Sequence, residues 1–216
     1  MAHVAYNELF DVASADATIN TYQIAKNGLD RVAAFAAFVL LAPVFLLIGA
    51  AIKAESRGPV FFRQQRNGLG GCVFKVWKFR TMYTQEDGAQ VSQATRNDSR
   101  VTGVGRFLRK TSLDELPQLL NVLMGEMSLV GPRPHAVAHN DYYAERIPDY
   151  TRRESVKPGI SGWAQINGFR GETAELSQMV QRVEHDIWYV RNQSILLDLR
   201  IMFLTPFYGL IHKNAY

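Results

Sequence analysis

The sequence is almost without cysteine, since Cys72 is the single one in 216 residues. One thiol excludes an internal disulfide and any zinc site built from several cysteines. The first 22 residues, MAHVAYNELFDVASADATINTY, also lack a basic n-region and carry three acidic side chains, which argues against a secretory signal there. No internal repeat is visible. We interpret residues 1–27 as a mobile or amphipathic arm.

What the chain does have is a moderate excess of positive charge. It contains 24 Lys and Arg against 20 Asp and Glu, and 47% of its residues are hydrophobic. The length suits one domain with a real core. The charge favours an anionic partner, such as a nucleic acid, a phosphorylated metabolite or an acidic membrane surface.

One long uncharged run, VAAFAAFVLLAPVFLLIGAAI, occupies residues 32–52. About 20 apolar residues can cross the hydrocarbon layer of a bilayer. Pro43, near the middle, would cost an uninterrupted helix about 3 kcal/mol. A kinked span and a re-entrant hairpin therefore both stay open, with a buried core helix as a third alternative. Basic residues flank both ends, so charge gives no orientation: Lys26, Arg31, Lys53 and Arg57.

Two strand-like runs follow, PVFFRQQ and CVFKVWKF, separated by Asn67-Gly68 and Gly70-Gly71. Aromatic and β-branched residues around such turn pairs predict a β-hairpin. Lys78 and Arg80 share one face of the second strand with apolar residues. These two cations are therefore either solvated edge charges or ligands of an anion.

The rest of the chain reads mainly as loop and helix. Residues 83–99 are polar and predict a loop. The spacing of the leucines in LPQLLNVLMGEM predicts a short amphipathic helix that ends at Gly125. The remaining expected segments are a polar helical stretch up to residue 153, a glycine-rich loop at 157–173, a helix from about Glu175 to Arg191, and an interfacial or core helix at the C-terminus. The expected fold is α+β: a membrane helix, re-entrant or spanning, followed by a small mixed globular domain with a β-hairpin and amphipathic interfacial helices.

Two acids stand side by side in RKTSLDELPQ, at Asp114 and Glu115. Ser112 and Glu115 match a helix capping box, but Pro117 would then clash with the carbonyl of Leu113 in the second turn. If the helix begins at Pro117 instead, both acids lie at its positive end. Asp114 could then act as a nucleophile, and Glu115 could bind Mg²⁺. Both interpretations stay open on local grounds.

Arg133 lies between two prolines in VGPRP, which restrict its backbone. A guanidinium held in this way suits bidentate binding of phosphate. Together with the acids and the basic strand, it favours phosphoryl transfer, in which positioning and charge neutralisation do most of the work. The His135 and His139 pair has zinc-ligand spacing without the glutamate of HExxH, and we discount a zinc site there. We also discount nucleic-acid binding, because the long apolar run argues against it.

Three segments resemble the bacterial sugar transferases, which are monotopic polyprenyl-phosphate phosphoglycosyl transferases. They are KFRTM, SLDELPQLLNVLMGEMSLVGPRP and KPGISGWAQINGFRG. The resemblance runs from about Gly28 to Tyr216. GPRPHAVAHN followed by NGFRGET is most similar to the undecaprenyl-phosphate glucose phosphotransferase branch.

The resemblance implies a reaction in two steps. Asp114 would attack the β-phosphate of a UDP-sugar, most simply UDP-glucose, and release UMP. Undecaprenyl phosphate would then take the phosphosugar from the Asp114 carboxylate. Glu115 would bind Mg²⁺. The residues expected to contact phosphate or the nucleotide are Lys78, Arg80, Arg109, Arg133, Lys157, Gly159 and Trp163.

The resemblance also implies a setting. Residues 28–55 would form a membrane hairpin broken at Ala42-Pro43, and residues 56–216 a catalytic domain on the cytoplasmic face of the bacterial inner membrane, in contact with lipid. The product would initiate an exopolysaccharide or a related glycan. UDP-galactose or an N-acetylhexosamine donor is an alternative, as is a role as an assembly partner of a polysaccharide complex; a homo-oligomer stays open.

Overall fold

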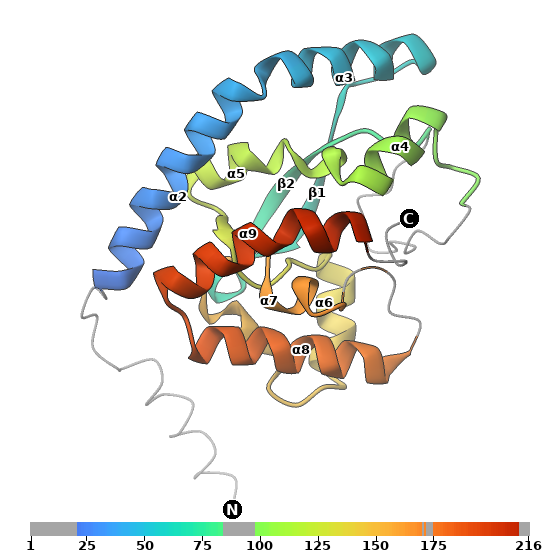
Figure 1. The fold of residues 1–216 in the computed structure, drawn as a ribbon. Helices are drawn as coiled ribbons and strands as arrows, with labels where there is room; N and C mark the ends of the chain where they lie inside the picture. The colour runs from blue at the N-terminus through green and yellow to red at the C-terminus, as the bar shows by residue number, and fades with distance from the viewer. Residues whose placement is uncertain (1–20, 84–97, 170, 172–174, 212–216) are drawn as a thin grey trace, which may run out of the picture.

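The structure is a computed structural model that describes residues 21–83, 98–169, 171 and 175–211. Most of the expected arm at residues 1–27 and most of the expected loop at 83–99 lie outside the described residues. The described chain is a mixed fold in which helices surround two small two-stranded sheets (Figure 1).

The apolar run forms a bent pair of helices, α2 (Thr21–Leu40) and α3 (Ala42–Glu55), with an angle of 60° between them. The break falls at Leu41, one residue before the expected Ala42-Pro43. Pro43 lies in the first turn of α3, where its missing N–H would have had no helical partner. None of the described helices is by itself long and apolar enough to cross a bilayer. The two helices of the bent pair together have the length and composition that a crossing requires.

The two faces of this helix pair differ. Ala34 on α2 is fully buried against Leu119 and Val122 of α5 (Gln118–Met124). Large apolar side chains on the other face are exposed, and they include Val32, Phe35, Val39, Leu40, Leu46 and Leu47. The pair therefore anchors to the globular part through one side and presents an apolar surface on the other.

The expected hairpin is confirmed as β1 (Phe61–Asn67) and β2 (Val73–Phe79), which pair antiparallel from Phe61–Phe79 to Asn67–Val73. The turn contains a short 3-10 helix, η1 (Leu69–Gly71), whose last two residues have positive φ angles of 62° and 76°. Glycine adopts this left-handed conformation without a steric penalty.

Asn121 on α5 fixes the hairpin against this helix. Its Nδ2 donates to the carbonyl of Lys75 at 2.8 Å, and its Oδ1 accepts from the backbone N–H of Trp77 at 2.9 Å. Asn121 is fully buried, so these bonds satisfy polar groups that could not reach water. They hold the strand that carries Lys78 in a fixed position.

The second sheet pairs β3 (Ser128–Val130) with β4 (Gly159–Ser161) in parallel. A Cβ added at Gly159 would lie 2.0 Å from the backbone nitrogen of Gly131. Only glycine allows the two backbones to approach this closely. Gly159 thus has a structural reason to be glycine.

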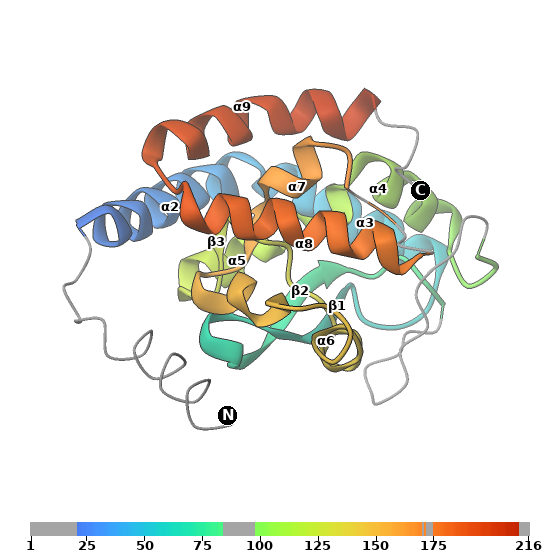
Figure 2. The same ribbon diagram turned by 90° about the horizontal axis from the view of Figure 1, so that it is seen from below.

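The remaining helices lie around these sheets, as the view in Figure 2 shows. They are α4 (Gly103–Thr111), α6 (Val137–Ala144), the 3-10 helix η3 (Tyr150–Ser155), α7 (Trp163–Ile166), α8 (Leu176–Arg191) and α9 (Ile195–Ile211). The expected helix from about Glu175 to Arg191 is confirmed as α8, with Glu175 as its N-cap.

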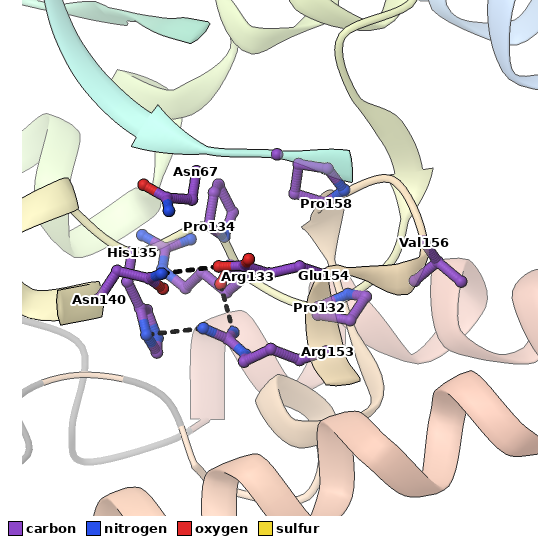
Figure 3. A pocket seen from close by; sticks show the side chains of 11 residues that line it. Asn67, Pro132, Arg133, Pro134, His135, Asn140, Arg153, Glu154, Val156 and Pro158 are labelled. Carbon is purple, nitrogen blue, oxygen red and sulfur yellow. Dashed lines mark hydrogen bonds between the residues drawn. The ribbon is translucent and has the colours of Figure 1, made fainter. Parts of the chain in front are cut away.

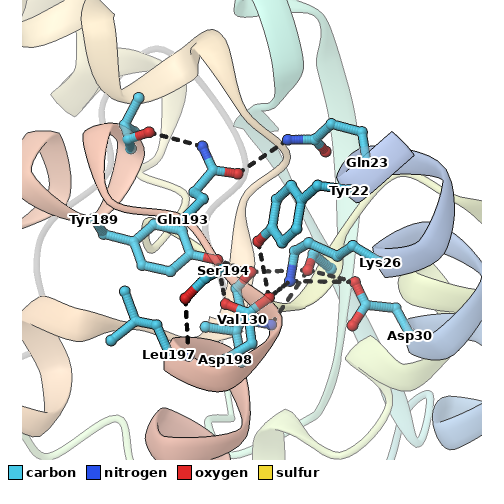
Figure 4. A network of polar contacts seen from close by, with 12 residues as sticks. Tyr22, Gln23, Lys26, Asp30, Val130, Tyr189, Gln193, Ser194, Leu197 and Asp198 are labelled. Carbon is cyan, nitrogen blue, oxygen red and sulfur yellow. Dashed lines mark hydrogen bonds and ion pairs between the residues drawn. The ribbon is translucent and has the colours of Figure 1, made fainter. Parts of the chain in front are cut away.

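A buried polar network ties α2 to the C-terminal helices (Figure 4). Lys26 on α2 donates to Asp198 on α9 at 2.6 Å, and the Tyr189 hydroxyl on α8 donates to the other oxygen of Asp198 at 2.7 Å. Asp30 accepts from Ser128 of β3 at 2.6 Å. Since every member is partnered, this network specifies how α2 sits on the globular part.

Candidate active site

The acidic pair lies between two helices. α4 ends at Thr111, and Ser112 adopts a left-handed conformation (φ 60°, ψ 16°) that turns the chain into a short 3-10 helix, η2 (Leu113–Glu115). The Ser112 side chain makes no capping hydrogen bond to η2. The capping-box interpretation is therefore wrong. α5 begins directly after Pro117, so the acids lie at its mouth, as the alternative predicted.

Two cations hold the carboxylate of Glu115. Lys78 at the end of β2 donates to its Oε1 at 2.9 Å. The Arg133 guanidinium donates in a bidentate manner, from Nη1 to Oε2 at 2.9 Å and from Nη2 to Oε1. Glu115 is 8% exposed. Burial opposes its ionisation, but the charges of Arg133 and Lys78 outweigh burial and hold its pKa well below the usual range.

Asp114 has different surroundings. It is half-buried, and its carboxylate accepts no hydrogen bond from any residue that the structure describes. Burial and the negative charge of Glu115 raise the pKa of Asp114 to about 6, although Lys78, Arg109 and Arg133 act in the opposite direction. Neighbouring carboxylates with pKa values pushed apart are typical of catalytic sites. Of the two, Asp114 is the one whose carboxylate accepts no hydrogen bond among the described residues.

The loop that carries Arg133 is fixed from behind. Arg153 donates to the Arg133 carbonyl at 2.5 Å, and Arg66 donates to the Pro134 carbonyl at 3.0 Å. Arg153 is itself paired with Asp186 on α8 through bonds of 3.0 and 2.7 Å. Arg153 is 4% exposed and Asp186 1%. A buried ion pair thus determines where the Arg133 backbone lies.

His135 belongs to the same support. Its Nδ1 lies 2.7 Å from Nη1 of Arg153 and 2.5 Å from the Tyr150 hydroxyl. Burial and the nearby Arg153 charge hold the pKa of His135 well below its usual range. The imidazole is therefore neutral at pH 7 and accepts from Arg153.

A small pocket lies beside Arg133, between the hairpin turn, the 132–135 loop and η3 (Figure 3). Its lining combines proline rings with polar side chains: Asn67, Gly68, Pro132, Arg133, Pro134, His135, Asn140, Arg153, Glu154, Val156 and Pro158. Figure 3 shows Arg153 between His135 and the Arg133 backbone.

Four residues expected at the site from the sequence do come together. They are Lys78, Asp114, Glu115 and Arg133. Arg109, in the last turn of α4, is near enough that its charge lowers the pKa of Asp114. The site is thus built from β2, the end of α4, η2 and the 132–135 loop.

Three expected residues lie elsewhere. Lys157 donates to Asn27 of α2 at 2.9 Å. Gly159 belongs to β4. Trp163 stacks on Trp188 of α8, with 4.6 Å between the ring centroids. Their glycine-rich segment is held against α2, β3 and α8, and no contact with the acidic pair is seen in the described part of the chain.

Arg80 is also not brought to the acids. Its guanidinium turns to the exit of α3, where it donates to the carbonyls of Ser56 and Arg57 at 2.8 and 2.6 Å. A Cβ added at Gly58, whose φ is 123°, would lie 2.0 Å from the same group. From the sequence we expected Arg80 to be either a solvated edge charge or a ligand of an anion. The structure shows a third role, in which Arg80 links the bent helix pair to β2.

Replacing Arg80 with methionine should therefore lower stability and leave unchanged the KM for the UDP-sugar that the sequence leads us to expect as a substrate. The charged hydrogen bonds lost predict a decrease of about 2–3 kcal/mol in the free energy of unfolding. Denaturant unfolding and the KM of the folded protein for that expected UDP-sugar are the measurements. Arg63→Met, at an exposed position of β1 where the guanidinium lies over the Trp77 ring, is the matched control and should cost at most about 1 kcal/mol. A raised KM without lost stability would support the phosphate role instead.

The residues that sequence reasoning missed are Arg66, Arg153 and Asp186. Asp186 is the buried partner of Arg153. No spacing in the sequence joins positions 133, 153 and 186. Only the tertiary arrangement of η3 and α8 reveals them.

Comparison with known proteins gives two findings. The family model described as "Bacterial sugar transferase" matches residues 21–212. The chain is also similar to proteins named UDP-glucose:undecaprenyl-phosphate glucose-1-phosphate transferase. One from Klebsiella pneumoniae is 58% identical over 178 residues, covering 82% of this chain and 38% of the relative. One from Escherichia coli K12 is 55% identical, covering 90% and 42%. One from Caulobacter vibrioides is 54% identical, covering 88% and 72%. The chain thus spans about two fifths of the length of the first two.

Proposed function

The chain belongs to the bacterial sugar transferase family, and from this premise we propose that it transfers glucose 1-phosphate from UDP-glucose to undecaprenyl phosphate. The expectation of the family from the sequence motifs is confirmed. The proposed activity rests chiefly on one observation: Asp114, with a raised pKa and no hydrogen bond among the described residues, lies beside Glu115 and its two cations.

In the proposed first step, an oxygen of the Asp114 carboxylate attacks the β-phosphorus of the donor. The bond from that phosphorus to the bridging oxygen breaks, and UMP leaves with the electron pair. In the second step, a phosphate oxygen of the carrier attacks the same phosphorus and releases the carboxylate. Splitting the transfer in this way replaces one difficult displacement with two easier ones.

The cations have a clear part in this scheme. Arg133 offers a planar fork that matches a phosphate, and Lys78 offers a point charge beside it. Arg109 adds positive charge near Asp114. Because the loop of Arg133 is fixed in advance by Arg153, little ordering is needed when the diphosphate arrives.

We further propose Mg²⁺ as a cofactor held by Glu115, with Asp114 adjacent. Mg²⁺ commonly takes one or two protein carboxylates and completes its shell with water and substrate phosphates. The two acids fit that donor set. Among the described residues no group of three or more His, Cys, Asp or Glu side chains could hold a metal, so phosphate oxygens would supply further ligands. When bound, the ion would offset the charge of the diphosphate.

The first step should slow as the pH falls through about 6. A protonated carboxyl is not a nucleophile, and the pKa of Asp114 is about 6. The rate of the initial UMP release should be constant above pH 7 and decrease about tenfold per unit well below pH 6. Rapid-quench measurements from pH 5 to 8 check this, with circular dichroism to confirm that the fold persists. A constant rate down to pH 5 would contradict the assignment of Asp114.

The activity itself is tested with purified protein, undecaprenyl phosphate, Mg²⁺ and a panel of UDP-sugars. We expect UMP release with UDP-glucose above all. Preference for UDP-galactose or an N-acetylhexosamine donor would change the substrate but keep the reaction. No UMP with any UDP-sugar would favour a role as a membrane-anchored partner of a polysaccharide assembly.

For the setting, we propose that α2 and α3 enter the inner membrane as a re-entrant hairpin, with the catalytic residues on the cytoplasmic face. The 60° bend and the exposed apolar face support this proposal. Single cysteines at Thr21 and Arg57, in a Cys72→Ser background, can be labelled in intact cells and in inverted vesicles. Labelling of both from the cytoplasmic side is expected, and labelling from opposite sides would indicate a span.

A further inference from the structure

Both carboxylate oxygens of Glu115, the expected metal ligand, already accept hydrogen bonds from cations. Its Oε1 accepts from Lys78 and Arg133, and its Oε2 accepts from Arg133. The side chains of Lys78, Arg133 and Glu115 are only 18%, 27% and 11% exposed, so the cluster is shielded from water. A metal ion approaching Glu115 would meet two cations that it must first displace or repel.

The charges in this cluster nearly balance. Lys78 and Arg133 offset Asp114 and Glu115 when both acids are ionised, and Arg109 adds one positive charge nearby. Mg²⁺ alone would add uncompensated positive charge to a shielded site, and a diphosphate alone would add uncompensated negative charge. Such an excess is costly where water is largely excluded. Mg²⁺ and a diphosphate together would leave the balance almost unchanged.

We propose that Lys78 and Arg133 form a latch on Glu115 that the diphosphate of the sugar nucleotide opens, so that the metal and the nucleotide bind together and each binds weakly alone. This inference rests on the proposed function, since it assumes that a diphosphate binds at these cations. The diphosphate gives Lys78 and Arg133 new anionic partners and so frees Glu115 for the metal.

The surrounding structure restricts the change to the side chains. The strand of Lys78 is fixed to α5 by Asn121, and the backbone of Arg133 is fixed by Arg153. The guanidinium and ammonium groups can therefore turn from a carboxylate to a phosphate without movement of the fold. By linkage, the factor by which nucleotide raises metal affinity must equal the factor by which metal raises nucleotide affinity.

The first test measures Mn²⁺ binding to the detergent-solubilised full chain by electron paramagnetic resonance, without nucleotide. Lys78→Met opens one side of the latch and should raise Mn²⁺ affinity at least about fivefold. Lys75→Met is the matched control, because Lys75 lies on the same strand, is exposed, and contacts neither acid. It should leave the affinity unchanged, and adding Glu115→Gln to Lys78→Met should remove the gain. Equal Mn²⁺ affinity in Lys78→Met and Lys75→Met would overturn the latch.

The second test measures UDP binding by calorimetry with and without Mn²⁺. In the wild type, Mn²⁺ should raise the affinity for UDP at least about fivefold, and in Glu115→Gln this gain should be lost. An equal gain in both proteins would mean that the metal acts only through the nucleotide in solution, and it would overturn the proposal. UMP release from UDP-glucose is assayed on the same preparations: turnover without coupling refutes the latch alone, whereas coupling without turnover supports the latch and refutes the proposed reaction.

Discussion

Replacing Asp114 with asparagine should abolish UMP release and yet leave the protein at least as stable as the wild type at pH 7. The amide has nearly the shape of the carboxylate but cannot form the acyl phosphate that would join the sugar phosphate to Asp114. The wild type, exposed to UDP-glucose without carrier lipid, should gain the mass of a glucose phosphate, and the variant should not. Intact-mass spectrometry and a coupled UMP assay are the measurements.

The stability part of this prediction follows from the sign of the pKa shift. The pKa of Asp114 is raised from 3.8 to about 6 in the folded protein, so the folded state binds this proton more tightly than the unfolded state. The resulting stabilisation is complete below pH 3.8 and is lost as the pH rises through 6. At pH 7 the ionised carboxylate therefore weakens the fold, and asparagine removes this cost. Denaturant unfolding at pH 5 and 7 checks the sign.

Asp141→Asn, at an exposed position of α6, is the matched control and should change neither activity nor stability. Turnover in Asp114→Asn at even one hundredth of the wild-type rate, with no adduct in the wild type, would refute the covalent route. Loss of stability in the variant would instead show that the carboxylate of Asp114 has a structural partner.

Local signals in the sequence were sufficient wherever one segment alone decides the structure. The paired strands and the glycines between them predicted the hairpin, because turn chemistry and alternation act over a few residues. The clash of Pro117 with a preceding carbonyl correctly argued against a capping box. Arg133 is only partly such a case, because its flanking prolines indicated a restricted backbone, but Arg153 from another segment holds its carbonyl.

Where a distant segment decides, the sequence was not sufficient. The alternation of side chains along the strand placed Arg80 on the same face as Lys78. It could not show that the Arg80 guanidinium would instead bind the backbone that follows α3. Lys157 instead donates a hydrogen bond to α2, and Trp163 stacks on a ring of α8. The helix break is a milder case: Pro43 fits the first turn of α3, so the bend moves back to Leu41.

The buried pair of Arg153 and Asp186 carries the other large expected effect. Asp186→Asn leaves a cation without its counter-charge in a buried position, which should cost about 3–5 kcal/mol of folding stability. It also releases the arginine that holds the Arg133 carbonyl. We therefore expect kcat/KM for UDP-glucose to fall more than tenfold, even after correction for the fraction of folded protein measured by circular dichroism.

A double variant separates the structural role of this pair from its positioning role. Arg153→Met with Asp186→Leu removes both charges, and replacing a buried ion pair with apolar side chains is often neutral or stabilising. Stability should thus recover towards the wild type, while the loop of Arg133 stays without its support and activity stays low.

Tyr189→Phe, which removes buried hydrogen bonds to Val130 and Asp198 away from Arg133, should lower stability without lowering the activity of folded protein. If activity instead recovers with stability in the double variant, the pair serves the fold alone, and the position of Arg133 must be set by its prolines and Arg66.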